Sequence, residues 1–364
     1  MEKIKKLLVI ICFGLVIFGL AVAHVIIPDA EASAVERRKL AQMPKISADA
    51  VFSSEYSTKL ETYFLDQFPL RDSFRTAKAF VNFDLLRVKD NNDIYFVDDG
   101  IYKLSYPLKE NQVTLAAKKI EQILAEHPQI GNAYFSLIPD KNYFVAAQNG
   151  YPSIDYSALL SQLREQVSSA EYIDIYDCLE LSDYYRTDTH WQQNKIHAVA
   201  QRLCDSLGVP CAPLSDYKEN TLEPFYGVFA GQAALPVEAD KIVYLTSPAT
   251  ENAKVTSVEQ TAPMKVYTLD DFKGNDPYDV FLSGAEAVIT IENPKAKTDK
   301  ELIIFRDSFG SSLTPLLIDS YAKITLLDLR YIGSSLIDDY ANFEGSDVLF
   351  LYSTMLVNSG GILK

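Results

Sequence analysis

Two short segments, far apart in the chain, carry the residue types that nucleophilic acyl chemistry requires. Residues 188–191 read DTHW and supply a carboxylate and an imidazole two positions apart. Residues 306–309 read RDSF and supply a hydroxyl. A histidine can take the proton of a serine hydroxyl while a carboxylate orients that histidine. We therefore predict that Asp188, His190 and Ser308 form a catalytic triad.

The elements around these segments decide whether the three side chains can meet. The apolar run 302–305 predicts a buried strand and residues 311–321 predict a helix, so Ser308 lies on the turn between them. Such a turn presents a side chain at the carboxyl edge of a sheet, beside the partly positive start of a helix. Asp188 and His190 are predicted to lie on a loop before the next helix, where residues two apart share one side.

Each segment also has a simpler interpretation. Asp188 or Thr189 can cap the following helix, which leaves His190 as a surface residue. Ser308, together with the aspartate before it, can cap the helix after the strand. Both segments, however, lie at the ends of predicted strands, and in open α/β sheets sites form at the carboxyl ends of strands. This coincidence favours the triad.

A metal site is a further alternative for the same loop. His190 and His197, with Asp188, would form it only if an unbroken helix brought the two histidines to one face. The sequence contains no third histidine nearby and no carboxylate pair at ligand spacing. We therefore predict neither a metal nor a cofactor.

Four cationic side chains are candidates for binding a polar substrate group or the oxyanion. The alternative for each is a solvated charge or a structural ion pair. These candidates are Arg71, Lys141, Arg306 and Arg330.

The amino terminus predicts export. Residues 7–27 contain no Asp, Glu, Lys or Arg, and three lysines precede them. A run of this length spans a bilayer, and the lysines favour a cytoplasmic position for residues 1–6. The alternative is a signal peptide cleaved near residues 21–23, which read AVA. The rest of the chain is extracytoplasmic in both cases: a single-pass membrane protein in the first, a secreted protein in the second.

Composition narrows the class of protein further. The chain has 364 residues, 48% of them apolar, which excludes disorder and allows a large core. Its formal charge of −15 argues against nucleic acid as a partner. Three cysteines follow the apolar run, so at most one disulfide is expected, with Cys204 and Cys211 as the candidate pair.

The remaining pattern predicts one α/β domain. Residues 28–56 are polar and irregular and are predicted to form a linker after the anchor. Helix and strand patterns alternate through 57–364, which indicates helices packed on a mostly parallel sheet. Residues 212–300 interrupt this alternation with short apolar runs rich in Gly, Pro, Thr and Val. We expect them to form a strand-rich insertion that covers the core.

Five sequence blocks, in this order along the chain, resemble the DHHW family of exported bacterial proteins. They also resemble the SGNH-hydrolase-like domain of the alginate O-acetylation proteins AlgJ and AlgX. The blocks are 68–72 (FPLRD), 138–141 (IPDK), 184–191 (YYRTDTHW), 305–309 (FRDSF) and 328–331 (DLRY).

This resemblance implies a flavodoxin-like, SGNH-hydrolase-like fold with a circularly permuted order of elements. It implies that Asp188 orients His190, that His190 is the base and that Ser308 is the nucleophile. Two departures stand out. Thr189 replaces the first histidine of the motif that names the family, and Arg306 stands where many SGNH enzymes have glycine.

The function expected from the resemblance is that of an extracytoplasmic serine esterase or O-acyltransferase. It would modify acetyl groups on cell-surface polysaccharide, with a membrane-bound acyl-donor protein as a further partner. The alternative is a catalytically inactive, membrane-tethered component that binds or assembles glycan.

Overall fold

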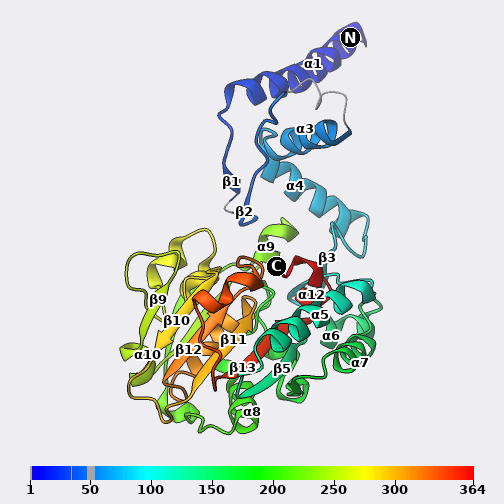
Figure 1. Cartoon of the computed structure of the whole chain (residues 1–364). Helices are drawn as coiled ribbons and strands as arrows, with labels where there is room; N and C mark the ends of the chain where they lie inside the picture. Colours follow the sequence, from blue (N-terminus) through cyan, green and yellow to red (C-terminus); the bar gives the residue numbers. More distant parts are fainter. Residues whose placement is uncertain (1, 34, 47–53) are drawn as a thin grey trace. The chain divides into compact units, whose positions relative to one another are not determined.

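A computed structural model describes residues 2–33, 35–46 and 54–364 of the chain (Figure 1). Contacts divide the chain into two compact units. The N-terminal unit comprises Met1–Asn92 with Ala230–Pro236, and the large unit comprises Asp93–Phe229 with Val237–Lys364. The large α/β body therefore begins at Asp93, whereas the sequence predicted a start at residue 57.

The N-terminal unit contains the apolar helix α1 (Glu2–Ile26), none of whose residues is buried. Among the described residues, α1 alone is long and apolar enough to cross a membrane, with a mean hydropathy of 2.8. The predicted linker holds a short antiparallel pair, β1 (Ala32–Ser33) and β2 (Arg38–Lys39), and its residues 47–53 lie outside the described residues.

Two helices complete this part of the chain, α3 (Ser54–Asp66) and α4 (Arg71–Phe80), and α4 continues into a π-helical turn over Val81–Leu85. Pro69 lies between them, where a helix cannot continue without loss of a backbone hydrogen bond. Both helices are joined to residues 28–46 by ion pairs, among them Arg38 with Asp66. These polar pairs explain why the helices belong to the N-terminal unit and not to the α/β body.

A seven-stranded sheet forms the centre of the large unit, in the order β6-β5-β13-β11-β12-β10-β9. Neighbouring strands in this order are parallel from β6 to β12. β10 pairs antiparallel with β12, and β9 pairs antiparallel with β10 at the edge. This confirms the mostly parallel α/β sheet expected from the sequence. The strands are β5 (Asn132–Ile138), β6 (Glu171–Tyr172), β9 (Lys254–Ser257), β10 (Val288–Glu292), β11 (Glu301–Arg306), β12 (Lys323–Leu327) and β13 (Asp347–Ser353).

Helices lie against both faces of this sheet (Figure 1). On β11, Leu302 and Ile304 join the core that contains α8, whereas Ile303 and Phe305 join the core that contains α5 and α7. This alternation follows from the period of two along a strand. The helices of the large unit are α5 (Glu110–Glu126), α6 (Asn142–Val145), α7 (Tyr156–Gln166), α8 (His197–Leu207), α9 (Val228–Ala233, which continues into the N-terminal unit), α10 (Pro248–Asn252), α11 (Phe309–Leu313) and α12 (Thr354–Val357).

The segment 212–300 is more than a cover over the core. Its strands β9 and β10 extend the central sheet, because Ile289 and Ile291 alternate into one of the two buried cores. Two other strands, β7 (Lys218–Phe225) and β8 (Asp240–Thr246), form a separate antiparallel pair. A hairpin is formed by β3 (Ile94–Val97) and β4 (Gly100–Lys103).

The helix predicted over 311–321 is shorter than expected. α11 ends at Leu313, and a 3₁₀ turn follows over Thr314–Leu316. Pro315 explains the change, because it has no N–H to donate to the carbonyl four residues earlier and its ring crowds that carbonyl. Ser308 therefore lies directly before a five-residue helix.

We predict that Phe305→Ala lowers the free energy of unfolding by about 3–5 kcal/mol, the usual cost of emptying a buried phenylalanine site. The Phe305 ring is fully buried and stacks on Phe350 with 4.5 Å between ring centroids. Urea unfolding of the full chain in detergent measures the change. Leu214→Ala, at an exposed position, is the control and should change the free energy by less than about 0.5 kcal/mol. Equal effects of the two variants would contradict this account of the core.

Candidate active site

Ser308 is presented by the turn that follows β11. The carboxylate of Asp307 holds this turn, because it accepts hydrogen bonds from the N–H groups of Phe309 (3.1 Å) and Ser353 (2.9 Å). The second bond ties the end of β11 to the end of its neighbour β13. Ser308 has helical backbone angles and makes no side-chain cap, and it is partly exposed. Its hydroxyl is therefore available for another partner.

That partner is His190, whose Nε2 lies 2.7 Å from Ser308 Oγ. The other ring nitrogen, Nδ1, lies 2.6 Å from Asp188 Oδ1. When Nδ1–H donates to the carboxylate, the lone pair of Nε2 is directed at the serine hydroxyl. The structure thus brings the three residues predicted from the sequence into one chain of hydrogen bonds. The helix α8 begins only at His197, so Asp188 and Thr189 do not cap it.

Asp188 is almost completely buried, and its carboxylate is held by two backbone donors. Oδ1 accepts the N–H of His190 (3.0 Å), and Oδ2 accepts the N–H of Val228 (2.8 Å). Donors aimed at both oxygens favour the ionised carboxylate. An ionised Asp188 is the form that can hold the imidazole in the tautomer described above.

The imidazole of His190 is also held by an aromatic ring. Tyr278 stacks on it with 3.8 Å between ring centroids and 7° between planes. The Tyr278 hydroxyl donates to Ser312 Oγ (2.8 Å), which also accepts the indole N–H of Trp191 (2.9 Å). Burial raises the pKa of Tyr278 well above its usual value, so the phenol stays neutral. Tyr278 belongs to the segment 212–300, and the sequence contained no signal that pointed to it.

Lys141 holds the loop that carries Asp188. Its ammonium lies among four backbone carbonyls, those of Ile101 (2.8 Å), Tyr185 (2.8 Å), Arg186 (3.0 Å) and Asp188 (3.1 Å). Burial lowers the pKa of Lys141 to about 7, while the charges of Asp188 and Asp240 favour its protonated form. Since the side chain is buried and its donors are occupied, Lys141 supports the loop from within the protein.

A second set of contacts holds the same loop from the segment 212–300. Asp240 accepts the N–H (2.8 Å) and hydroxyl (2.6 Å) of Thr187. Gly227 donates its N–H to Thr187 Oγ1 (2.8 Å) and packs so closely that an added Cβ would lie 2.3 Å from Asp188 Cβ. Neither Gly227 nor Asp240 belongs to a pattern that sequence reasoning could have identified.

The other predicted cations have protein partners. Arg306 is fully buried and donates to Ser311 Oγ (3.0 Å) and to the carbonyl of Gly284 (3.1 Å). Arg330 forms an ion pair with Asp328 (2.6 Å). Arg71 lies in the N-terminal unit, where it forms an ion pair with Glu36 (2.5 Å). A role of these side chains in binding substrate stays a prediction.

The histidine considered for a metal site is used elsewhere. His197 Nε2 lies 2.8 Å from the carbonyl of Ala212. Across the described parts of the chain, no group of three or more His, Cys, Asp or Glu side chains could hold a metal ion. The described cysteines, Cys204 and Cys211 among them, are free thiols.

Comparison with known proteins finds a similarity to one protein family. The model of the DHHW protein family matches residues 159–327, a range that includes Asp188, His190 and Ser308. The chain matches no curated protein. A solved structure of a DHHW family protein from Eubacterium siraeum superposes with a TM-score of 0.60 at 20% identity, over 75% of this chain and 95% of that one.

Two further solved structures are similar. PatB1 of Bacillus cereus, solved with a sulfonyl adduct, has a TM-score of 0.59 at 21% identity, over 76% of this chain and 99% of its own. The O-acetyltransferase domain of Pseudomonas putida AlgJ has a TM-score of only 0.44 at 13% identity, over 74% and 93% of the two chains. The resemblance to the DHHW family predicted from the sequence is thus confirmed, by the family model over residues 159–327 and by a fold shared with a DHHW family protein.

Proposed function

We propose that this protein is an extracytoplasmic serine O-acyltransferase or esterase that acts on acetyl groups of cell-surface polysaccharide. The observation that carries the proposal is the continuous chain of hydrogen bonds from Asp188 through His190 to Ser308. The acetyl group, the polysaccharide and a membrane-bound acyl donor come from the family resemblance found in the sequence.

In the first half of the reaction, Ser308 Oγ attacks the carbonyl carbon of the acetyl donor. His190 Nε2 takes the hydroxyl proton, and the ionised Asp188 stabilises the imidazolium that forms. Backbone N–H groups beside the serine would hold the negative oxygen of the tetrahedral intermediate. When this intermediate collapses, His190 returns the proton to the leaving oxygen, and the acetyl group stays as an ester on Ser308.

In the second half, a hydroxyl attacks the acetyl ester while His190 takes its proton. The bond from the acetyl carbon to Ser308 Oγ then breaks, and His190 returns the proton to Ser308. A sugar hydroxyl as the acceptor makes the protein a transferase, and water makes it an esterase. Water exclusion decides between them. Tyr278, stacked on His190, covers one face of the imidazole and so keeps water from that face. Transfer to a sugar hydroxyl is our first choice.

The site is proposed to lie outside the cytoplasm, with α1 as a retained single-pass anchor. The length and apolar composition of α1 support this, as do the lysines before its apolar run. A secreted form, released by signal cleavage, is the alternative.

The nucleophile can be tested by covalent labelling. A serine-directed phosphonate should react with the full chain at Ser308, because His190 lowers the barrier to attack by its hydroxyl. Peptide mapping by mass spectrometry locates the label, and Ser308→Ala should remove both the label and acetyl-ester turnover. Turnover that survives in Ser308→Ala would refute the mechanism. Polysaccharide binding without turnover or label would support the inactive glycan-binding alternative.

The orienting role of Asp188 predicts a large effect without loss of fold. Asp188→Asn should lower turnover by up to about ten-thousandfold, because an amide stabilises the wrong imidazole tautomer. Initial rates on an acetyl ester measure the loss, and circular dichroism confirms the fold. His197→Ala is the control, since His197 binds the carbonyl of Ala212 and is not in the triad. Equal losses in the two variants, with activity abolished by a chelator, would replace the triad with a metal site.

The close approach of Gly227 to the loop gives a third prediction. Gly227→Ala should lower turnover by about 100-fold, because the new methyl group must displace Thr187 and Asp188, and small displacements of a catalytic group are costly. Gly333→Ala is the matched control, since its methyl group would meet only Ser335 Oγ, at 3.8 Å. Both variants are compared by initial rates and thermal unfolding. Unchanged turnover in Gly227→Ala would show that the loop tolerates displacement.

A further inference from the structure

The turn between α3 and α4 exposes a cluster of large apolar side chains. We call Phe64, Leu65, Phe68, Leu70 and Phe74 the apolar patch. Their exposed fractions range from 38% for Phe68 to 69% for Leu70. The rings of Phe68 and Phe74 meet edge to face with 5.5 Å between centroids. So many exposed large apolar side chains within a few residues mark a surface that binds something apolar.

The apolar patch is joined to the last turn of the proposed anchor helix. The ring of His24 in α1 packs on Tyr63 (5.6 Å between centroids) and on Phe64 of the apolar patch (5.2 Å). His24 Nδ1 also lies 3.1 Å from the carbonyl of Gln67. The end of α3 therefore contacts the last turn of α1, the part of the proposed anchor that would leave the bilayer.

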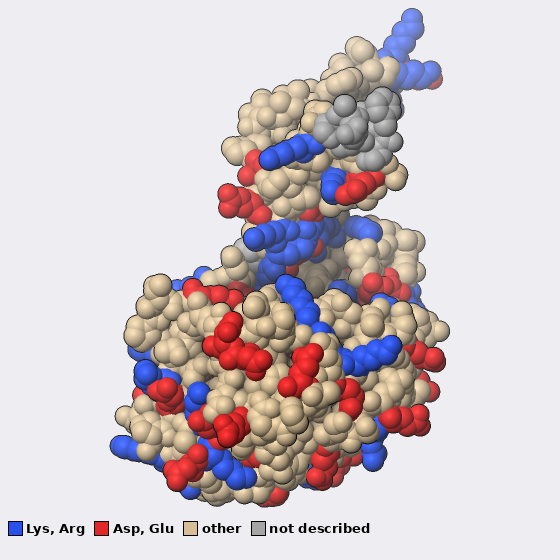
Figure 2. All heavy atoms as spheres, viewed as in Figure 1, with Lys and Arg blue, Asp and Glu red and all other residues tan. Residues whose placement is uncertain are grey.

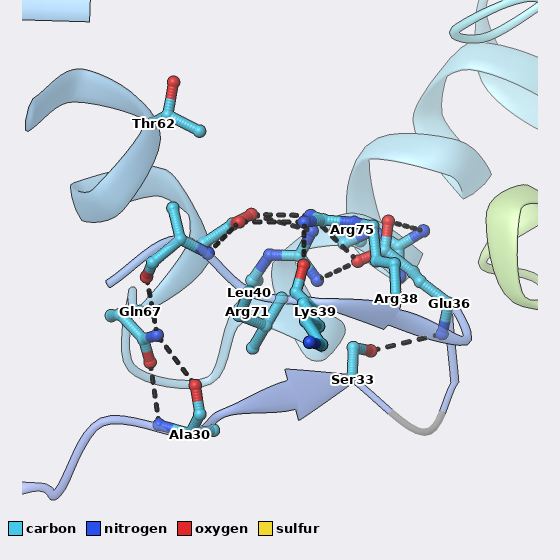
Figure 3. A network of polar contacts seen from close by, with 12 residues as sticks. Ala30, Ser33, Glu36, Arg38, Lys39, Leu40, Thr62, Gln67, Arg71 and Arg75 are labelled. Carbon is cyan, nitrogen blue, oxygen red and sulfur yellow. Dashed lines mark hydrogen bonds and ion pairs between the residues drawn. The ribbon is translucent and has the colours of Figure 1, made fainter. Parts of the chain in front are cut away.

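Ion pairs hold this turn in place. Arg38 donates to both oxygens of Asp66, and Arg71 and Arg75 each contact Glu36 (Figure 3). The hydrogen bonds from Arg38 lower the pKa of Asp66 to about 2, so the pair stays ionised at neutral pH. The apolar side chains are thus displayed by a fixed turn whose charges are already paired.

The charge of this region does not oppose contact with an anionic membrane surface. Residues 28–92 carry as many Lys and Arg as Asp and Glu, so the acidic excess of the chain lies beyond Asn92. Acidic side chains are spread over the face of the large unit drawn in Figure 2. An anionic lipid surface would repel the large unit but not residues 28–92.

We propose that the apolar patch inserts into the boundary between headgroups and acyl chains of the bilayer that α1 crosses. This rests on the anchor in the proposed function. Phenylalanine and leucine are the side chains that interfacial helices bury at this depth. The chain then has two membrane contacts, one that spans the bilayer and one that lies on its extracytoplasmic surface.

Brominated lipids test this directly, because bromine on an acyl chain quenches a tryptophan that reaches it. The chain has one native tryptophan, Trp191, which is completely buried and supplies a constant background. Leu65→Trp and Leu336→Trp are prepared as full chains in phosphatidylcholine vesicles with and without dibrominated acyl chains. Leu65 is in the apolar patch, and Leu336 is a matched exposed leucine of the large unit.

The added emission of Leu65→Trp should be blue-shifted and mostly quenched by the brominated lipid, while that of Leu336→Trp should be neither. Equal quenching in the two variants would overturn the proposal. A blue shift without quenching would also overturn it, because it would mean that protein covers the patch.

Failure of the anchor is recognised separately, by washing the same vesicles with alkaline carbonate. Release of the full chain into the supernatant would overturn both the anchor and the docking surface. Retention of the chain with an unquenched Leu65→Trp would overturn the docking surface alone. Labelling of Ser308 depends on neither outcome and continues to test the catalytic proposal.

Discussion

The buried ammonium of Lys141 is the constraint on which the arrangement of the site depends. Taking a charge out of water costs several kcal/mol unless it is surrounded by groups that solvate it. Here the solvating groups are four backbone carbonyls, three of them from residues 185–188. The loop must adopt one conformation to supply these oxygens together. That conformation also places the carboxylate of Asp188 within hydrogen-bond distance of His190 Nδ1.

Much of this architecture could be predicted because it follows from local pattern. The strands around Ser308 are short apolar runs buried on both faces, and a parallel sheet brings their carboxyl ends to one edge. The turn after β11 could therefore be placed at that edge from the sequence. The DTHW loop was expected at a strand end as well, but residues 173–187 contain no strand of the central sheet. The break between α3 and α4 followed from one proline.

The parts that could not be predicted depend on contacts between residues distant in sequence. The segment 212–300 supplies three residues that contact the loop: Tyr278, Gly227 and Asp240. Its apolar runs are short and irregular, so neither the helical nor the strand periodicity identifies which residues these three would contact. The IPDK block at the end of β5 did identify Lys141 as a candidate site residue, but the positive charge of its side chain suggested contact with substrate. Its burial against carbonyls depends on how β4 and the loop at 185–188 pack, which no local pattern reveals. Likewise, α3 and α4 pack in the N-terminal unit because they form ion pairs with residues 36 and 38, which no local pattern predicts.

The spacing of Asp188 and His190 has a consequence for how such a site can survive rearrangement of a gene. Asp188 and His190 lie two residues apart in one short peptide, so a rearrangement elsewhere in the gene keeps them together. Within the triad, the hydrogen bond between His190 Nε2 and Ser308 Oγ joins them to the nucleophile, across 118 positions of the chain. New chain ends, or a change in the order of the strands, leave this short peptide intact, and the contacts that hold it against the nucleophile then have to be restored. A site made of two separate segments can therefore occur in sheets whose strands are connected in different orders.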